Sequence, residues 1–127
     1  MRRIILIIGL FVMVLSMTLL VITLSGCQSS FTGDRIKNPD AYLIDFDSMT
    51  GTDSHSILME KDQELQVEYK VTKGRVDLEV QEEGGDLVYR GNGLEEGDFT
   101  LIAGNTGTYQ ISIKAKRAQG FLHIQKK

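Results

Sequence analysis

Apolar and polar residues alternate with a period of two through most of the chain after residue 40, and this pattern constrains the fold more than any other feature. It is clearest in "ELQVEYKVT" (64–72), where every second residue is apolar: Leu65, Val67, Tyr69 and Val71. The same alternation occurs in "AYLIDFD" (41–47), "RVDLEVQ" (75–81) and "TYQISIKAK" (108–116). A period of two is typical of β-strands with one buried face and one solvated face.

Four shorter segments complete the predicted set of strands: "HSILME" (55–60), "DLVYR" (86–90), "DFTLIA" (98–103) and "GFLHIQ" (120–125). Turn residues separate the segments every ~8–12 residues, which is typical of sandwiches and barrels. No window after residue 27 has a helical apolar stripe, so a parallel βαβ fold is excluded. We predict an all-β fold, a small antiparallel, jelly-roll-like β-sandwich of about seven to eight strands.

The first residues have the composition of a signal peptide. A short basic start, Met1-Arg2-Arg3, precedes an uncharged apolar run at 4–23, and small residues follow it. Such segments direct export and are removed from the mature protein, so we exclude them from the reasoning about the fold.

The motif Leu24-Ser25-Gly26-Cys27 resembles the lipobox of bacterial lipoproteins, in which leucine and two small residues precede a cysteine. The resemblance implies cleavage between Gly26 and Cys27, a diacylglyceryl group on Cys27 and acylation of the new N-terminus. Two buried acyl chains give stable anchoring, whereas one chain holds only marginally. We therefore expect a lipid-anchored protein at the outer, extracytoplasmic face of the cell membrane.

This interpretation divides the chain into a signal peptide (1–26), a lipidated tether (27–40) and a β-sandwich domain (41–127). Cleavage would leave 101 residues with 12 basic and 17 acidic side chains, a formal charge of −5. An acidic chain is a poor partner for nucleic acid and for anionic lipid surfaces. The only membrane contact that we expect is the lipid on Cys27.

Two alternatives remain open for the N-terminal segment. The 20 apolar residues at 4–23 could span a hydrocarbon core of about 30 Å as an uncleaved anchor. Cys27 could instead be reactive, although no neighbouring group would lower its pKa and the nearest histidine is His55. An intrachain disulfide is impossible with a single cysteine.

Residues 45–56, "DFDSMTGTDSHS", superficially suggest a calcium loop. Met49, Thr50 and Ser56 occupy the positions where an EF-hand needs an oxygen ligand, glycine and glutamate. We therefore predict a polar loop between two strands. Two acidic groups beside glycine turns are weak Ca²⁺ candidates, although such acids also keep exposed turns solvated: Glu82, Glu83 and Asp86, and Glu95, Glu96 and Asp98. No other metal site and no cofactor are expected.

We find no pattern that predicts catalysis. Asp53, Ser54 and His55 are neighbours in the sequence, and on an extended chain their side chains point in alternating directions instead of converging. The second histidine, His123, lies in the last predicted strand, and two histidines are too few for a typical zinc site. We therefore predict that the protein is not an enzyme.

The aromatic residues give little support for a sugar-binding platform. The chain has no tryptophan, and Tyr42, Tyr69 and Tyr109 fall on the apolar phase of their strands, which predicts core positions with hydroxyls near the rim. Tyr89 could face either side of its strand. Tyr109, which follows Gly107, is predicted to form a corner that ties two strands together.

Asp77-Leu78 and Gly107-Thr108-Tyr109 resemble the pattern of pre-peptidase C-terminal domains and related jelly-roll modules, although no peptidase accompanies them here. The chain is also similar to small Gram-positive lipoproteins of unassigned activity. We expect a non-catalytic binding or interaction module, with an envelope protein or a glycan as partner. The alternative is a structural or envelope-stress component of the membrane–wall space without a small ligand. A concave, aromatic- or carboxylate-lined face would favour binding, and a convex, uniformly charged surface would favour the alternative.

Overall fold

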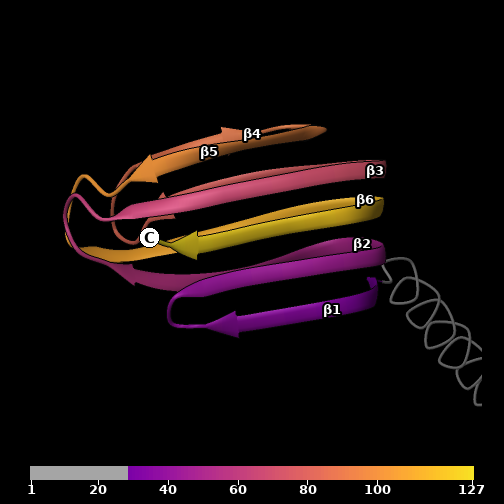
Figure 1. Ribbon diagram of the computed structural model, residues 1–127, viewed down its shortest axis with the longest axis horizontal. Helices are drawn as coiled ribbons and strands as arrows, with labels where there is room; N and C mark the ends of the chain where they lie inside the picture. Colours follow the sequence, from indigo (N-terminus) through magenta and orange to yellow (C-terminus); the bar gives the residue numbers. More distant parts are fainter. Residues whose placement is uncertain (1–28) are drawn as a thin grey trace, which may run out of the picture.

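The structure, a computed structural model, describes residues 29–127. The predicted signal peptide, the lipobox and Cys27 lie outside the described residues. Six antiparallel strands make up the fold (Figure 1): β1 (Ser30–Asn38), β2 (Ala41–Met59), β3 (Glu64–Glu82), β4 (Leu87–Gly91), β5 (Glu96–Ile102) and β6 (Gly107–Lys126). In this part of the chain no helix is long and apolar enough to cross a membrane.

Three long strands, β2, β3 and β6, bend near their middles, so one sheet doubles back on itself and forms two packed layers (Figure 1). Layer I contains β1, β5, the first halves of β2 and β3 and the second half of β6. Layer II contains β4, the second halves of β2 and β3 and the first half of β6. The predicted all-β sandwich is therefore confirmed.

Irregular registers mark each bend. The pairing of β2 with β6 shifts between Phe46 and Gly51, and that of β3 with β6 shifts around Gly74. Gly74 has φ 73°, and a Cβ there would lie 2.2 Å from the carbonyl oxygen of Arg117. Only glycine fits such a close approach of two backbones.

The bends also switch the phase of the apolar residues. In β2 the buried residues are even-numbered up to Phe46 and odd-numbered at Ile57 and Met59. The irregular register at the bend changes which alternate positions face inward. Both halves of the strand therefore direct apolar side chains into the same core.

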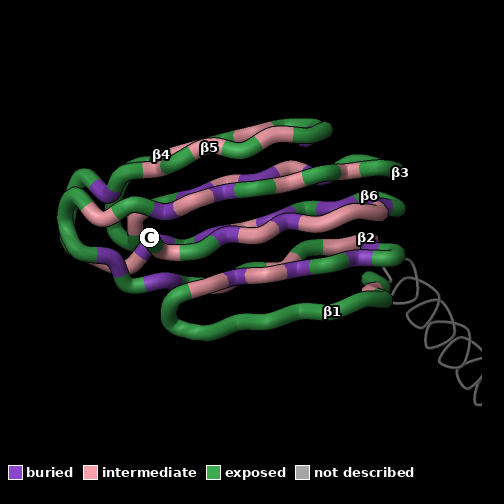
Figure 2. Tube along the Cα trace, in the orientation of Figure 1, coloured by how far each residue is buried: buried purple, intermediate pink, exposed green. Residues whose placement is uncertain are grey.

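The core lies between the two layers, and its residues come mainly from the three long strands. Figure 2 shows buried segments alternating with exposed ones along β2, β3 and β6. The predicted inward faces are confirmed by a single cluster of buried side chains that includes Tyr42, Ile44, Phe46, Leu65, Val67, Val76, Leu78, Val80, Tyr109, Ile111, Ile113 and Ala115.

The structure has six strands because predicted segments join into longer ones. The segments 41–47 and 55–60 are the two halves of β2, and the same holds for two segment pairs in β3 and β6. The predicted loop at 45–56 is wrong, because these residues remain paired with β6 through most of the bend. Their polar, turn-forming composition marks a bend within one strand.

Residues 30–38, which we expected in the tether, form β1 and pair along the first half of β2. Phe31 packs against the core, while most of the strand is exposed (Figure 2). Charged residues are common on edge strands because they discourage pairing with other sheets. The folded domain therefore begins at β1 and not at residue 41.

Candidate functional site

The outer surface of layer II contains an open hollow of about 550 Å³. Its floor crosses β2, β6 and β3, one rim is the loop after β4, and the other is the edge where β1 meets β2. The lining is almost entirely polar: Lys37, Thr52, Asp53, Ser54, Asp77, Glu79, Asn92, Gln110, Ser112, Ile113 and Lys114.

Two rows of directly paired residues build the floor. One row runs from Ser54 through Ser112 to Glu79. The next row runs from Thr52 through Lys114 to Asp77. Paired residues on neighbouring strands point to the same side of a sheet, so these rows place hydroxyl, carboxylate and ammonium groups side by side.

Asp77 holds the rim formed by the loop after β4. Its Oδ1 accepts hydrogen bonds from the backbone N of Gly93 at 2.7 Å and from Nε of Arg75 at 3.0 Å. The bond from Gly93 is the main cause that lowers the pKa of the Asp77 carboxyl below its ordinary value, Arg75 adds to it, and burial opposes it. The carboxylate thus fixes the loop beside the floor.

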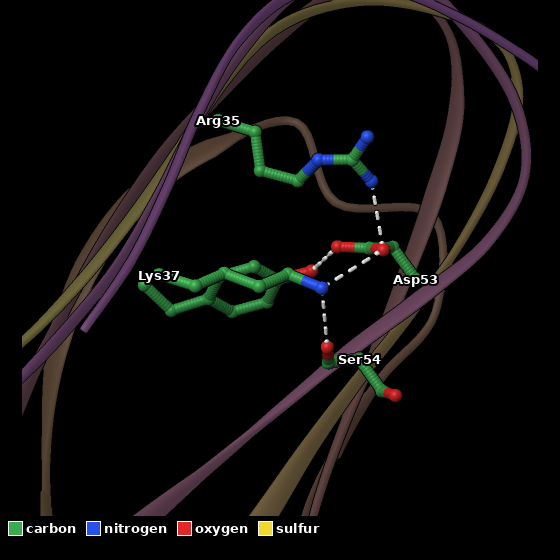
Figure 3. Close-up of polar contacts among 5 residues, drawn as sticks. Arg35, Lys37, Asp53 and Ser54 are labelled. Carbon is green, nitrogen blue, oxygen red and sulfur yellow. Dashed lines mark hydrogen bonds and ion pairs between the residues drawn. The ribbon is translucent and has the colours of Figure 1, made fainter. Parts of the chain in front are cut away.

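Lys37 and Asp53 form the opposite rim and belong to a polar cluster that also contains Arg35 and Tyr42, which we call the edge latch. Figure 3 shows Arg35 and Lys37 reaching toward Asp53. Asp53 Oδ1 lies 2.8 Å from Nη1 of Arg35 and 3.2 Å from Nζ of Lys37. The Tyr42 hydroxyl donates to Asp53 Oδ2. Lys37 also donates to the backbone oxygen of Ser54 at 2.8 Å. The edge latch therefore ties β1 in layer I to the second half of β2 in layer II.

The protonation states of the edge latch follow from its contacts. Burial alone would raise the pKa of the Asp53 carboxyl, but hydrogen bonds from Tyr42 and Lys37 and the charges of Lys37 and Arg35 bring it below its ordinary value. Burial, reinforced by the hydrogen bond to Asp53, raises the pKa of Tyr42 well above its ordinary value. At neutral pH the cluster is thus an aspartate held by two cations and a neutral phenol.

The histidine and serine beside Asp53 do not converge with it. Ser54 lines the hollow, whereas His55 Nε2 lies 2.7 Å from the backbone oxygen of Asn38, toward β1. The predicted alternation of these neighbours is confirmed. His123 Nε2 contacts Asp45 Oδ1 at 2.7 Å, on the outer face of layer I.

The weak calcium candidates lie at separate places. Glu82, Glu83 and Asp86 surround the turn between β3 and β4, where Glu82 contacts Asn105 at 3.4 Å. Glu95 immediately precedes β5, and Glu96 and Asp98 lie within it. Among residues 29–127, no group of three or more histidine, cysteine, aspartate or glutamate side chains is placed to hold a metal ion.

The predicted positions of the tyrosines are confirmed. Tyr42 and Tyr109 are buried, and Tyr69 packs half-buried against the core. The Tyr109 hydroxyl donates to the backbone oxygen of Asn105 at 2.6 Å, which ties the start of β6 to the preceding loop. Tyr89, left undecided by its sequence, faces the core side and packs on Phe99 with ring centroids 4.5 Å apart.

Sequence reasoning missed Arg35 and Lys37 as site residues because they fell in the predicted tether. Their alternate spacing along the sequence is the feature that could have predicted their common orientation. Phe31, Arg35 and Lys37 are all odd-numbered, and the register places Arg35 and Lys37 opposite Ile44 and Tyr42. Cationic residues at inward positions of an edge strand indicate an ion pair with an acidic residue inside the sandwich. The sequence does not identify that partner, because Asp53 lies in the other layer.

No protein-family model matches the chain, and no curated protein matches it. Several solved structures are similar in fold. A periplasmic inhibitor of g-type lysozyme from Aeromonas hydrophila is 14% identical with a TM-score of 0.45, over 80% of this chain and 89% of that one. The pre-peptidase C-terminal domain of a Bacillus anthracis collagenase is 12% identical with a TM-score of 0.48, over 80% and 100%.

A third similar structure is TmCBM61 in complex with β-1,4-galactotriose. It is 15% identical with a TM-score of 0.36, over 72% of this chain and 64% of that one. All three TM-scores are below 0.5.

Proposed function

We propose that the chain is a non-catalytic binding module, held at the outer face of the cell membrane by lipid on Cys27, whose hollow binds a neutral, hydroxyl-rich ligand of the oligosaccharide class. The observation that supports this proposal most directly is the polar hollow on layer II. A concave, carboxylate-lined face is the feature that favours binding over a purely structural role.

The lining matches the hydrogen-bonding needs of sugar hydroxyls. A hydroxyl both donates and accepts, so it is best satisfied by neighbouring donors and acceptors. Asp77 and Glu79 supply acceptors, Lys114 supplies donors, and Asn92 and Gln110 supply both. Carboxylates and ammonium groups are interleaved on the floor, which favours a neutral ligand over one of a single charge sign.

The size of the hollow fits a ligand of a few sugar rings. Its volume of about 550 Å³ lies within the range of small-molecule sites. The lining contains no aromatic side chain. Binding therefore rests on hydrogen bonds, each of which contributes about 0.5–1.5 kcal/mol net, and we expect modest affinity.

The proposed anchor sets the orientation of the domain. Ser30 begins β1 opposite Thr50, beside the bend of β2, and Cys27 is only three residues earlier in the chain. A lipid on Cys27 would hold the bends near the membrane. The turns at 38–41, 59–64 and 102–107 would point away from it, because they connect the opposite ends of the strands.

The hollow is tested by titrating the purified full chain, in nonionic detergent, with cellotetraose, β-1,4-galactotriose and chitotetraose in a calorimeter. We expect at least one of them to bind and Ser112→Trp, which fills the floor, to weaken it about tenfold or more, or about 1.4 kcal/mol. Ser48→Trp, at an exposed position of β2 outside the lining of the hollow, is the matched control. Absence of binding by all three, or binding that Ser112→Trp leaves unchanged, contradicts the proposed ligand site and favours the structural alternative.

The anchor has a separate test. Cys27→Ser should leave unprocessed precursor and abolish acyl labelling in cells that process lipoproteins. Normal acyl labelling of this variant would refute lipidation at Cys27. An unprocessed wild-type chain that remains in the membrane would instead support the transmembrane alternative.

A further inference from the structure

The outer face of layer I contains a partly exposed strip of apolar and aromatic side chains that crosses three strands. Ile36 of β1 lies opposite Leu43 of β2, and Leu43 lies opposite His123 of β6. The ring of Phe121 packs on the imidazole of His123, with centroids 4.8 Å apart. Ile36 is 52% exposed. Contiguous apolar patches on a soluble surface usually mark an interaction site.

Carboxylates surround this strip. The acidic side chains at outward positions of layer I are Asp34, Asp45, Glu64, Glu68, Glu96 and Asp98. Among the strand residues at these positions in the described chain, the only lysine is Lys70, which lies opposite Glu96 and Phe121. The face therefore combines an apolar centre with a strongly negative rim.

Carboxylates of like charge are paired across neighbouring strands of this face, although Asp45 also contacts His123 Nε2 at 2.7 Å. Asp34 lies directly opposite Asp45, and Glu68 directly opposite Asp98. Like charges at directly paired positions destabilise a sheet. On layer II the corresponding pairs have opposite signs, because Lys114 faces Asp77 and Arg90 bonds Glu79 at 2.9 Å. The like-charge pairs thus occur on the face that bears the apolar strip.

We propose that this face of layer I docks a basic surface of another protein, with the apolar strip as the central anchor. Lysine and arginine side chains of the partner pair with the surrounding carboxylates and relieve the like-charge repulsion. Phe121 offers its ring to an apolar side chain of the partner. An apolar centre within a charged rim is the common anatomy of a protein–protein interface.

Charge decides against other occupants. A second copy of this chain would bring one acidic face against another, and an anionic membrane would be repelled. No group of three or more acidic or histidine side chains in residues 29–127 is placed to hold a metal ion. The docking face lies on the opposite side of the sandwich from the hollow, so the two can be occupied at the same time.

The test uses three twelve-residue peptides of alternating sequence, Arg-Leu, Arg-Ser and Glu-Leu, titrated into the full chain in nonionic detergent. We expect affinity in the order Arg-Leu, then Arg-Ser, with no binding of Glu-Leu. Raising the salt from about 0.05 M to about 0.2 M should weaken binding, because screening shortens the range of charge interactions.

Two variants locate the binding on the face. Glu68→Gln with Asp98→Asn should weaken Arg-Leu binding about tenfold. It should leave the melting temperature equal or higher, because it removes a like-charge pair. Phe121→Ser should weaken Arg-Leu more than Arg-Ser, because only the former uses the apolar strip.

The matched control is Glu60→Gln with Glu83→Gln, which makes the same change of charge in two loops. The proposal is overturned if the Glu68 and Asp98 variant weakens binding no more than this control does. It is also overturned if Phe121→Ser weakens the binding of both arginine peptides equally. Because these measurements use no sugar, their failure is distinguishable from failure of the proposed ligand site in the hollow.

Discussion

The two layers of the sandwich meet at two open edges, and different side chains fill the gap between the layers at each edge. At one edge, β1 faces the second half of β2, and the edge latch closes the gap with Asp53, Arg35 and Lys37. At the other edge, β4 faces β5, and Phe99 of β5 packs on Tyr89 of β4 at 4.5 Å. Tyr69 meets the same Phe99 ring at 6.2 Å. We call the second the aromatic edge.

The side chains at the two edges differ in how much each is expected to contribute to the stability of the fold. Burial of aromatic side chains lowers the free energy of the folded state, and it requires only that the rings pack in a suitable geometry. In a partly buried ion pair, the attraction between the charges roughly offsets the cost of removing them from water, so the pair adds little net stability. Removing one partner is nevertheless destabilising, because the other charges are left unpaired. Lys37 and Asp53 of the edge latch line the hollow, whereas Tyr69, Tyr89 and Phe99 do not. We therefore expect the aromatic edge to stabilise the fold and the edge latch to shape the site.

The largest expected effect is at the aromatic edge. Phe99→Ala should lower the free energy of unfolding by about 2–4 kcal/mol, because it removes the ring that joins Tyr69 and Tyr89. Ile102→Ala, on the same strand but 60% exposed, should cost less than about 0.5 kcal/mol. Urea denaturation measures both. A Phe99→Ala cost as small as that of Ile102→Ala would contradict a stabilising role for this edge.

An intermediate effect is expected at the edge latch. Asp53→Asn keeps the shape of the side chain but removes the charge that holds Arg35 and Lys37, and should cost about 1–2 kcal/mol in the same denaturation assay. Asp47→Asn, an exposed aspartate of β2, is the matched control and should change stability by less than about 0.5 kcal/mol. If Asp53→Asn costs more than Phe99→Ala, the comparison of the two edges is reversed.

The smallest effect is a pH dependence that separates the edges. The pKa of Asp53 is lowered in the folded state, so its stabilisation is present above the unfolded pKa of about 3.9 and is lost as pH falls through the folded pKa. The stability difference between wild type and Asp53→Asn should therefore shrink below about pH 4. The difference for Phe99→Ala should stay constant over the same range. Thermal unfolding across a pH series measures both differences. Melting temperatures of wild type and Asp53→Asn that run parallel through this pH range would contradict the predicted pH dependence.

The sequence predicted much of the fold because burial leaves a local signature. Alternation in 64–72 and 108–116 identified the buried faces of β3 and β6, and the core positions of Tyr42 and Tyr109 followed from the same phase. The bends were harder to predict. Met49 and Gly51 occur among turn-forming residues, and local composition does not distinguish a bend within a strand from a loop between two strands.

The candidate site was predicted much less well than the fold. The edge latch joins Asp53 to Arg35 and Lys37, which are 18 and 16 residues away along the chain and belong to the other layer. Ser54, Ser112 and Glu79 meet on the floor only because the register of three strands aligns them. The spacing of Arg35 and Lys37 indicates their face of β1, but the pairing of residues across strands and layers leaves no periodic pattern in the sequence.

The sequence by itself determined that the chain is all-β and which faces of its strands are buried, because apolar burial leaves a local pattern along the chain. Only the tertiary structure decided that three strands run through both layers, that β1 belongs to the folded domain and that polar residues from β1, β2, β3 and β6 line one hollow. These features depend on bends and cross-strand register, which arise when distant segments pair and their side chains settle into a shared core.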